Sequence, residues 1–307
     1  MPDLVVRGEA GPRGRPISEA YGVYPCVSGQ PVHTHPDKVR TPVMVDRATH
    51  DNAKAAALRA LHVPGQPLVA PNAWDAVSAE IIERAGFSAV ATSSAAVSAS
   101  RGWADGEAAP VEEMAAAAAA IARSVSVPVT VDFERGYGLA PQDLVERFAQ
   151  TGAVGLNLED SDPATGSLVD VDVQVTFLRN VRSAAEAADV DLVVNARTDS
   201  FLRQVGSPEE RLAASIARGN RYLEAGADCV YPLGTGDPHT IAALVNGIDG
   251  PVNVAFGVTS PLNLDEIAGL GVARVTFGPG LQRTVYSWFE QVCLPGLFGV
   301  PDADGTV

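Results

Sequence analysis

Two carboxylates, Asp132 and Glu134, lie two residues apart where an apolar β-type segment runs into the sequence Gly136-Tyr137-Gly138. In a strand, residues i and i+2 point to the same side, so we expect the two side chains to converge where the strand ends. Two like charges held close together are costly unless a cation lies between them. Hard oxygen ligands suit Mg²⁺, with Mn²⁺ as the alternative, so the sequence predicts a divalent metal site.

Further polar side chains occur where other predicted strands end. Glu159 and Asp160 follow one apolar run, and Arg197 lies at the end of the next. Because the carboxyl ends of parallel strands carry the active sites of such folds, we expect a metal next to an anion-binding guanidinium. The candidate site comprises Ser93, Ser94, Ala95, Asp105, Asp132, Glu134, Tyr137, Glu159, Arg197 and Asn253.

Several of these residues also have a purely structural interpretation. Asp105 could be a turn or cap residue, and Asp160 could cap a loop. Arg197 could form a structural ion pair with Glu159. No single residue decides between the two interpretations, but their conjunction on successive strand ends favours a functional site.

The chain from residue 65 onward contains no lysine and a single histidine, His239. A lysine Schiff base is therefore excluded there, and imidazole has almost no part in acid–base chemistry. Any reaction must use carboxylates, arginine, hydroxyls, backbone amides and a metal. Tyr137, Asp105 and Glu159 are the local candidates for the acid–base group, and nothing in the sequence favours one over the others.

From residue 65 the sequence alternates short apolar β-type runs with helical patterns, as expected for buried parallel strands connected by helices. The predicted strands are 68–71, 89–93, 127–132, 154–158, 192–196, 229–232, 252–255 and 274–277. The predicted helices are 75–85, 111–124, 141–150, 171–188, 208–224, 238–246, 261–269 and 281–292, and another helical segment covers 46–61.

Four predicted helices end in a glycine that leads directly into a strand: Gly86, Gly152, Gly226 and Gly271. Glycine is favoured there because the residue after a helix often has a left-handed conformation. Eight βα units in about 230 residues predict an α/β fold of the (β/α)8 TIM barrel type. A doubly wound open sheet is the alternative, but the segment 70–74 after the first strand is not glycine-rich.

The net charge of −15 argues against nucleic acids and anionic membrane surfaces as partners. No apolar run approaches the roughly 18 residues of a membrane span. The three cysteines, Cys26, Cys229 and Cys293, show no metal-type spacing and no disulfide framework. This usage indicates a reducing, cytoplasmic environment.

Residues 1–43 differ from the rest of the chain. They are rich in Gly and Pro and lack helical periodicity and a long apolar segment. We therefore predict an irregular N-terminal leader at 1–43, which is not a secretory signal, followed by one barrel domain at 44–307.

Six sequence pieces occur in order along the predicted barrel: 71–75, 92–95, 102–105, 132–138, 155–160 and 196–199. Together they resemble the isocitrate lyase/phosphoenolpyruvate mutase superfamily over residues 67–290. The segment 132–138 corresponds to the motif that the family writes D-x-D-x-G-Y-G, with Glu134 one carbon longer than the usual Asp. The resemblance implies a Mg²⁺-dependent barrel that binds a small 2-oxoacid or its enolate.

The resemblance also implies roles for individual residues. It implies that Asp132 binds the metal directly, while Asp105, Glu134 and Glu159 hold it through water. Arg197 would bind the substrate carboxylate. The amides around Ser94 and Ala95 would form an oxyanion cradle, and the other substrate-binding candidates are Trp74, Ser93 and Asn253. Members of the family often swap their last helix between subunits, so a homo-oligomer, either a dimer or a tetramer, is implied.

The chain departs from the family after Asp160. Isocitrate and methylisocitrate lyases carry a gating loop there with a K-[KR]-C-G-H motif, whereas residues 161–168 contain no Cys, Lys or His. The phosphonomutase loop reads roughly P-K-T-N-S-L, and Pro163 to Leu168 follow that outline with Ala164 and Gly166 in place of Lys and Asn.

Three functions follow from this reading. The first is a lyase that cleaves a C–C bond next to a 2-oxoacid, with the metal, Arg197 and the amides around Ser94 and Ala95 stabilising an enolate. The second is a phosphonopyruvate or carboxyphosphonoenolpyruvate mutase or hydrolase, which the missing Lys and Asn disfavour. The third is a non-catalytic 2-oxoacid-binding protein, which the deficient loop suggests.

Overall fold

The computed structural model describes residues 47–257, 260 and 262–298. The leader predicted at 1–43 lies outside the described residues, so the division into leader and barrel stays a prediction. Within the described residues, no helix is long and apolar enough to cross a membrane.

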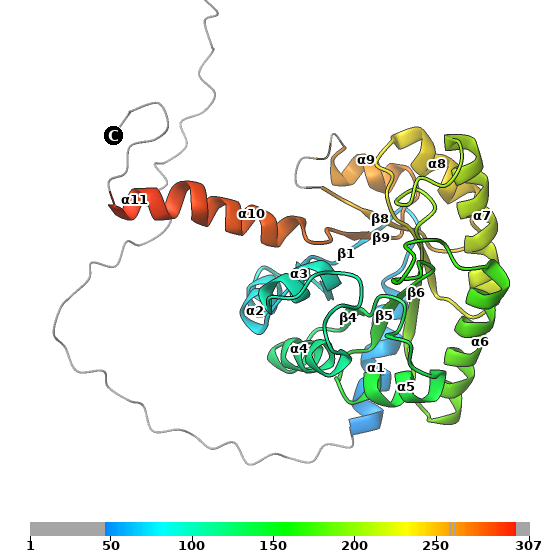
Figure 1. The fold of residues 1–307 in the computed structure, drawn as a ribbon, viewed down its shortest axis with the longest axis horizontal. Helices are drawn as coiled ribbons and strands as arrows, with labels where there is room; N and C mark the ends of the chain where they lie inside the picture. Colours follow the sequence, from blue (N-terminus) through cyan, green and yellow to red (C-terminus); the bar gives the residue numbers. More distant parts are fainter. Residues whose placement is uncertain (1–46, 258–259, 261, 299–307) are drawn as a thin grey trace, which may run out of the picture. The chain divides into compact units, whose positions relative to one another are not determined.

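The fold is a parallel barrel surrounded by helices (Figure 1). Two hydrogen-bonded ladders have the orders β2-β3-β4-β5-β6-β7 and β1-β9-β8, and all their pairs are parallel. The strands are β1 (Leu68–Val69), β2 (Asn72–Ala73), β3 (Val90–Thr92), β4 (Val129–Asp132), β5 (Gly155–Glu159), β6 (Val193–Thr198), β7 (Cys229–Pro232), β8 (Asn253–Ala255) and β9 (Arg274–Thr276).

The two ladders join into a closed barrel. A parallel bridge between Val230 and Val252 connects β7 to the start of β8. At the other junction, β1 and β2 are two parts of one strand, which pairs first with β9 and then with β3. The (β/α)8 prediction is therefore confirmed, and the doubly wound alternative is wrong because the strands follow their sequence order around a closed ring.

The helices begin and end close to the predicted positions. They are α1 (Arg47–Ala60), α2 (Ala76–Arg84), α3 (Ser94–Ser100), α4 (Val111–Ser124), α5 (Pro141–Ala149), α6 (Val171–Ala187), α7 (Pro208–Glu224), α8 (Pro238–Gly247), α9 (Leu264–Gly269) and α10 (Gly280–Trp288), followed by the π-helix Phe289–Cys293 and α11 (Leu294–Phe298). Capping boxes at Asp75, Ser207 and Asn263 satisfy backbone donors where α2, α7 and α9 begin. One helix, α3, was not predicted: no helix was expected between the strand at 89–93 and the helix at 111–124.

Helix α1 closes the amino-terminal end of the barrel. Leu58 is fully buried against Leu68, Ala91 and Val193. Arg59 donates to the Asp191 and Asp228 carboxylates at 2.6–3.0 Å, which fixes α1 to the loops before β6 and β7. With this end filled, polar side chains can collect at the opposite, carboxyl end of the strands.

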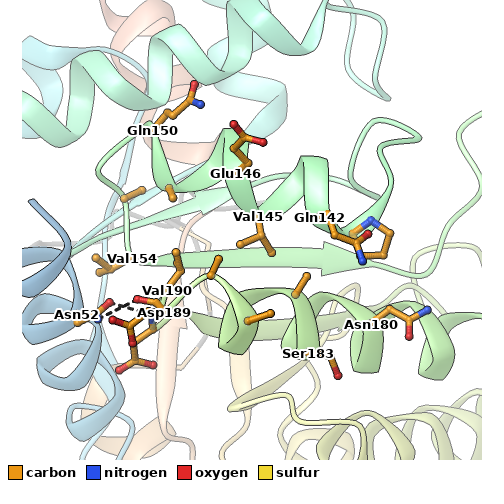
Figure 2. A pocket seen from close by; sticks show the side chains of 17 residues that line it. Asn52, Gln142, Val145, Glu146, Gln150, Val154, Asn180, Ser183, Asp189 and Val190 are labelled. Carbon is orange, nitrogen blue, oxygen red and sulfur yellow. Dashed lines mark hydrogen bonds between the residues drawn. The ribbon is translucent and has the colours of Figure 1, made fainter.

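A groove of about 900 Å³ lies on the outer surface between α5 and α6, next to α1 (Figure 2). Its walls come mainly from small and apolar side chains such as Val145, Ala184 and Val190, with Asn52 at one end. None of its lining residues belongs to the predicted site, so the groove is separate from that site.

Candidate active site

The predicted site residues come from the ends of four neighbouring strands. Asp132 is the last residue of β4, and Glu159 is the last residue of β5. The strand register places Asp132 beside Asn157 and Glu159 beside Arg197. Ser93 and Ser94 follow β3 directly and begin α3. The structure therefore brings the predicted Asp, Glu, Arg and Ser side chains to one end of the barrel.

Asp132 is fixed by the segment that follows β3. Its Oδ2 accepts hydrogen bonds from the Ser94 amide at 3.1 Å and from the Ser94 hydroxyl at 2.9 Å. Its own amide donates to Thr92 Oγ1 at 3.0 Å, and Asn157 Nδ2 lies 3.4 Å from Oδ1. The first amides of a helix have no partner within the helix, so the Ser94 amide is available to a carboxylate. In this structure it therefore holds Asp132.

Glu134 does not lie beside Asp132 in the way that strand alternation predicts. Strand β4 ends at Asp132, and Glu134 has a left-handed backbone with φ 49°. Its carboxylate accepts from the Tyr137 hydroxyl and from the Glu107 amide, both at 2.6 Å. Strand alternation therefore does not bring Asp132 and Glu134 together, as the sequence analysis expected, because the period of two applies only inside a strand.

Burial sets the charge behaviour of Glu134. Its side chain is 3% exposed, and this burial raises its pKa to about 7. The hydrogen bond from Tyr137 opposes that shift, while the charges of Asp132 and Asp105 add to it. Glu134 therefore lies within electrostatic reach of two other carboxylates.

Arg197 is buried and fully engaged with carboxylates. Its Nη1 lies 2.6 Å from Glu159 Oε2, and its Nε and Nη2 donate to the two oxygens of Asp199 at 2.6 and 3.0 Å. Burial raises the pKa of Glu159, the guanidinium opposes this, and the charges of Asp199, Asp132 and Glu134 add to it. The ion pair between Arg197 and Glu159 that the sequence offered as a structural interpretation is present.

Other predicted residues lie farther from this cluster or make different contacts. Asp105 is exposed in the loop between α3 and α4. Trp74 packs edge-on against Tyr286 of α10, with ring centroids 6.2 Å apart. Asn253 is fully buried, and its Nδ2 donates to Thr276 Oγ1 at 3.2 Å. Ala95 is half-buried in the first turn of α3. Their roles stay predictions.

Three residues of this region were missed as site residues. Asp199 accepts from Arg197 Nε and Nη2 and lies just after β6, so its position two residues from Arg197 was the one signal in the sequence. Asn157 Nδ2 donates to Asp132 Oδ1, and the strand register that pairs the two residues is not specified by the sequence. Glu107 contacts the turn after β4 across 27 to 30 residues of sequence, and only its position two residues after Asp105 hints at this.

The loop after β5 is short and closed on itself. Ser161 and Leu168 form an antiparallel bridge, and the Asp162 amide donates to the Ser167 carbonyl at 2.8 Å. The Ser161 hydroxyl donates to Asp199 Oδ2 at 2.6 Å and accepts from Arg203 Nε at 3.0 Å. The base of the loop is thus tied to the carboxylate that positions Arg197.

The side chains present fit a hard divalent cation that takes few direct ligands. Across the described part of the chain, no three His, Cys, Asp or Glu side chains are arranged as a complete cage for an ion. Burial and mutual repulsion nevertheless raise the pKa of Glu134 and of Glu159, and a nearby cation would reverse that effect. Mg²⁺ commonly keeps several waters and binds through one or two carboxylates, which suits this set of oxygens.

Comparison with known proteins identifies a consistent group. The family model described as phosphoenolpyruvate phosphomutase matches residues 58–294. The uncharacterized protein Rv1998c of Mycobacterium tuberculosis is 36% identical over 219 residues, which cover 71% of this chain and 80% of that protein. The 2,3-dimethylmalate lyase of Eubacterium barkeri is 31% identical over 228 residues, which cover 71% of this chain and 77% of that enzyme. A crystal structure of phosphonopyruvate hydrolase with oxalate and Mg²⁺ superposes with a TM-score of 0.68 and 26% identity, covering 80% of this chain and 88% of that chain.

Proposed function

Because this chain belongs to the phosphoenolpyruvate mutase/isocitrate lyase superfamily, a group of enzymes that act on small acids, we propose that it is a Mg²⁺-dependent lyase. Its substrate would be a small 2-hydroxy diacid. Loss of the hydroxyl proton and cleavage of the adjacent C–C bond would release a 2-oxoacid and the enolate of a second carboxylic acid, which is then protonated on carbon. The observation that carries the proposal is the buried Arg197 among carboxylates at the ends of β4, β5 and β6.

Asp132 is the residue that would hold the metal directly. Asp105, Glu134 and Glu159 would hold it through water. A bound Mg²⁺ supplies electrostatic stabilisation of the negative charge that develops on the enolate oxygen. Support for Mg²⁺ comes from the oxygen-only set of side chains and from the related phosphonopyruvate hydrolase structure.

Arg197 is the residue that would bind the substrate carboxylate. Asp199 binds the Nε and Nη2 atoms of its guanidinium, so Nη1 faces Glu159 and would face the substrate when it binds. A substrate carboxylate at Arg197 competes with Glu159 for the same Nη1. This exchange would free Glu159 to accept the proton that must leave the substrate hydroxyl as the C–C bond breaks.

Tyr137 is the candidate for returning a proton to carbon. Its hydroxyl is half-buried and donates to Glu134 at 2.6 Å, so it is oriented rather than free to rotate. Asp105 is the remaining acid–base candidate, but it is exposed on a loop. The proposal therefore assigns proton removal to Glu159 and proton return to Tyr137.

A phosphonate hydrolase or mutase is the second candidate, and one observation favours it. The loop that lacks the family's Lys has Arg203 beside it, with Nε 3.0 Å from Ser161 Oγ. A Cβ placed on Gly166 would lie 3.5 Å from Arg203 Nη1, so the guanidinium reaches the loop tip. Arg203 could thus supply the cationic partner that a phosphonate needs. A non-catalytic binding role is not retained, because the related proteins of assigned activity are enzymes.

We also propose that the enzyme is a cytoplasmic homo-oligomer. Helix α10 and the turns after it run away from the barrel (Figure 1) and expose Trp288, Phe289, Val292 and Leu297. An exposed row of large apolar side chains on one helix is typical of an interface. The family resemblance makes a second copy of this chain the partner, with the helix swapped between subunits.

The function is tested by turnover of purified protein with Mg²⁺ or EDTA. 2-Methylisocitrate, isocitrate and 2,3-dimethylmalate are assayed for release of an oxoacid, and phosphonopyruvate is assayed for release of phosphate. The lyase proposal predicts Mg²⁺-dependent product from at least one 2-hydroxy acid and loss of that product in Arg197→Lys. Release of phosphate from phosphonopyruvate, or a C–P rearrangement of it, without product from any 2-hydroxy acid would select the second candidate. Oxalate and Mg²⁺ binding without any turnover would contradict both.

A further inference from the structure

Asp105 has no contact of its own that would place it at the site. It lies exposed in the loop between α3 and α4, and within the described residues its side chain makes no hydrogen bond or ion pair. Some other residue must hold the loop in place.

Glu107, two residues later, makes three hydrogen bonds to the turn after β4. Its amide donates to Glu134 Oε2 at 2.6 Å. Its carboxylate Oε1 accepts from the Arg135 amide at 3.0 Å and from the Tyr137 amide at 2.7 Å. These bonds run in both directions between two loops that are 27 to 30 residues apart in sequence.

These hydrogen bonds join residues whose backbone dihedral angles are unfavourable for non-glycine residues. Glu107, Glu134 and Tyr137 have φ of 59°, 49° and 57°. They are three of the five non-glycine residues with positive φ in the described part of the chain. Left-handed backbone at such residues persists only where the surroundings hold it, and it is concentrated at functional sites. The hydrogen bonds of Glu107 are contacts that can hold it.

We propose that Glu107 is a positioning residue that locks the Asp105 loop onto the turn after β4 and thereby assembles the outer carboxylates of the metal site. The inference rests on the proposed metal site. Glu107 acts through Asp105 and Glu134, and the oxygen that it uses for this is Oε1, which accepts from two backbone amides. The contact between the two loops needs an acceptor oxygen at the position of Glu107 Oε1, and it does not need a negative charge there.

The requirement for an acceptor oxygen gives a matched pair of variants. Glu107→Gln keeps a carbonyl oxygen where Oε1 lies, while Glu107→Ala removes it. By titration calorimetry, Mg²⁺ affinity should fall about tenfold or more in Glu107→Ala, the range expected when an outer partner of a metal site is lost. Glu107→Gln should retain the wild-type affinity within about threefold.

A double-mutant cycle with Asp105→Ala tests whether Glu107 acts through Asp105. Once Asp105 is removed, Glu107→Ala should have a clearly smaller effect on Mg²⁺ affinity than it has in the wild type. Full additivity would overturn the proposal. So would Glu107→Gln losing as much affinity as Glu107→Ala, since that result would make Glu107 a charged ligand.

Hydrogen exchange tests the lock without any metal. In Glu107→Ala, the Arg135 and Tyr137 amides should exchange at least about tenfold faster, while amides of β7 and β8 keep their rates. Unchanged exchange at 135 and 137 would overturn the lock. If the wild type bound no Mg²⁺ while the exchange result held, the metal site would fail and the lock itself would stand, so the two failures are distinguishable.

Discussion

Arg197 Nη1 lies 2.6 Å from Glu159 Oε2, and the two residues are register partners on β6 and β5. The pair is about nine-tenths buried, and Asp199 holds the opposite side of the same guanidinium. A buried cation between two carboxylates is held in one orientation, at the cost of desolvating all three groups. An incoming substrate carboxylate can therefore replace an interaction that is already formed, instead of entering an empty site.

Arg197→Lys is predicted to weaken oxalate binding by about tenfold to a hundredfold, the range for losing one or two hydrogen bonds to a charged group. The single ammonium group of lysine cannot donate to both oxygens of Asp199 while also facing Glu159. The measurement is titration calorimetry with oxalate in the presence of Mg²⁺. Arg218→Lys is the matched control, because Arg218 is also paired with a buried carboxylate, Asp160, outside the proposed substrate position. Equal loss in both variants would contradict the assignment of Arg197.

Asp132→Asn is predicted to lower Mg²⁺ affinity by about a hundredfold or more, while the fold is retained. The amide oxygen can still accept from Ser94, so the contact to the start of α3 survives the change. The affinity is measured with Mn²⁺ by electron paramagnetic resonance and with Mg²⁺ by calorimetry. Asp160→Asn removes another carboxylate charge at a strand end. Asp160 Oδ2 accepts from Tyr222 and Arg218, and the side-chain oxygen that Asn keeps can still accept from the Asp199 amide. The variant should reduce the melting temperature and leave metal affinity intact.

The sequence identifies the elements better than it identifies the contacts between them. Helices Val111–Ser124 and Pro208–Glu224 begin and end at the predicted residues, because each has a clear apolar period and a proline near its start. The helix Ser94–Ser100 was missed because a short segment of Ser and Ala has no apolar period of its own.

The site contacts were harder to predict because they depend on register and on unusual backbone. The contact of Asn157 with Asp132 follows from how β4 and β5 align, and no residue pattern states that alignment. Glu134 does not follow strand alternation, because its backbone is left-handed. Glu107 binds Glu134 from a loop that is distant in sequence. Local periodicity contains neither fact.

His62 is predicted to make stability depend on pH in the acid range. Its ring is 7% exposed, and burial, together with the charge of Arg274, lowers its pKa from 6.5 to about 4. As the pH falls from 6.5 towards 4, the unfolded chain therefore takes up this proton before the folded chain does. The folded state should lose up to about 3 kcal/mol from this residue across that window and nothing above it.

His62→Gln removes this titration, so its free energy of unfolding should fall less than that of the wild type between pH 7 and pH 4.5. Urea denaturation at the two pH values measures the difference. His239→Gln is the control, because His239 is exposed and should leave the wild-type pH dependence unchanged. Parallel pH curves for wild type and His62→Gln would show that His62 is not held neutral in the fold.

Trp288→Glu is predicted to dissociate the proposed homo-oligomer. Trp288 is 56% exposed on α10, between the apolar residues Val285 and Val292. A carboxylate placed at the centre of an apolar interface would have to be buried unpaired, which costs several kcal/mol and shifts the equilibrium to single chains. Light scattering coupled to size-exclusion chromatography measures the mass. Val205→Glu changes a comparably exposed apolar residue, 49% exposed in the loop after β6, and should leave the mass unchanged. A wild-type chain that elutes as a monomer at micromolar concentration would contradict the proposed interface, and so would an unchanged oligomer in Trp288→Glu.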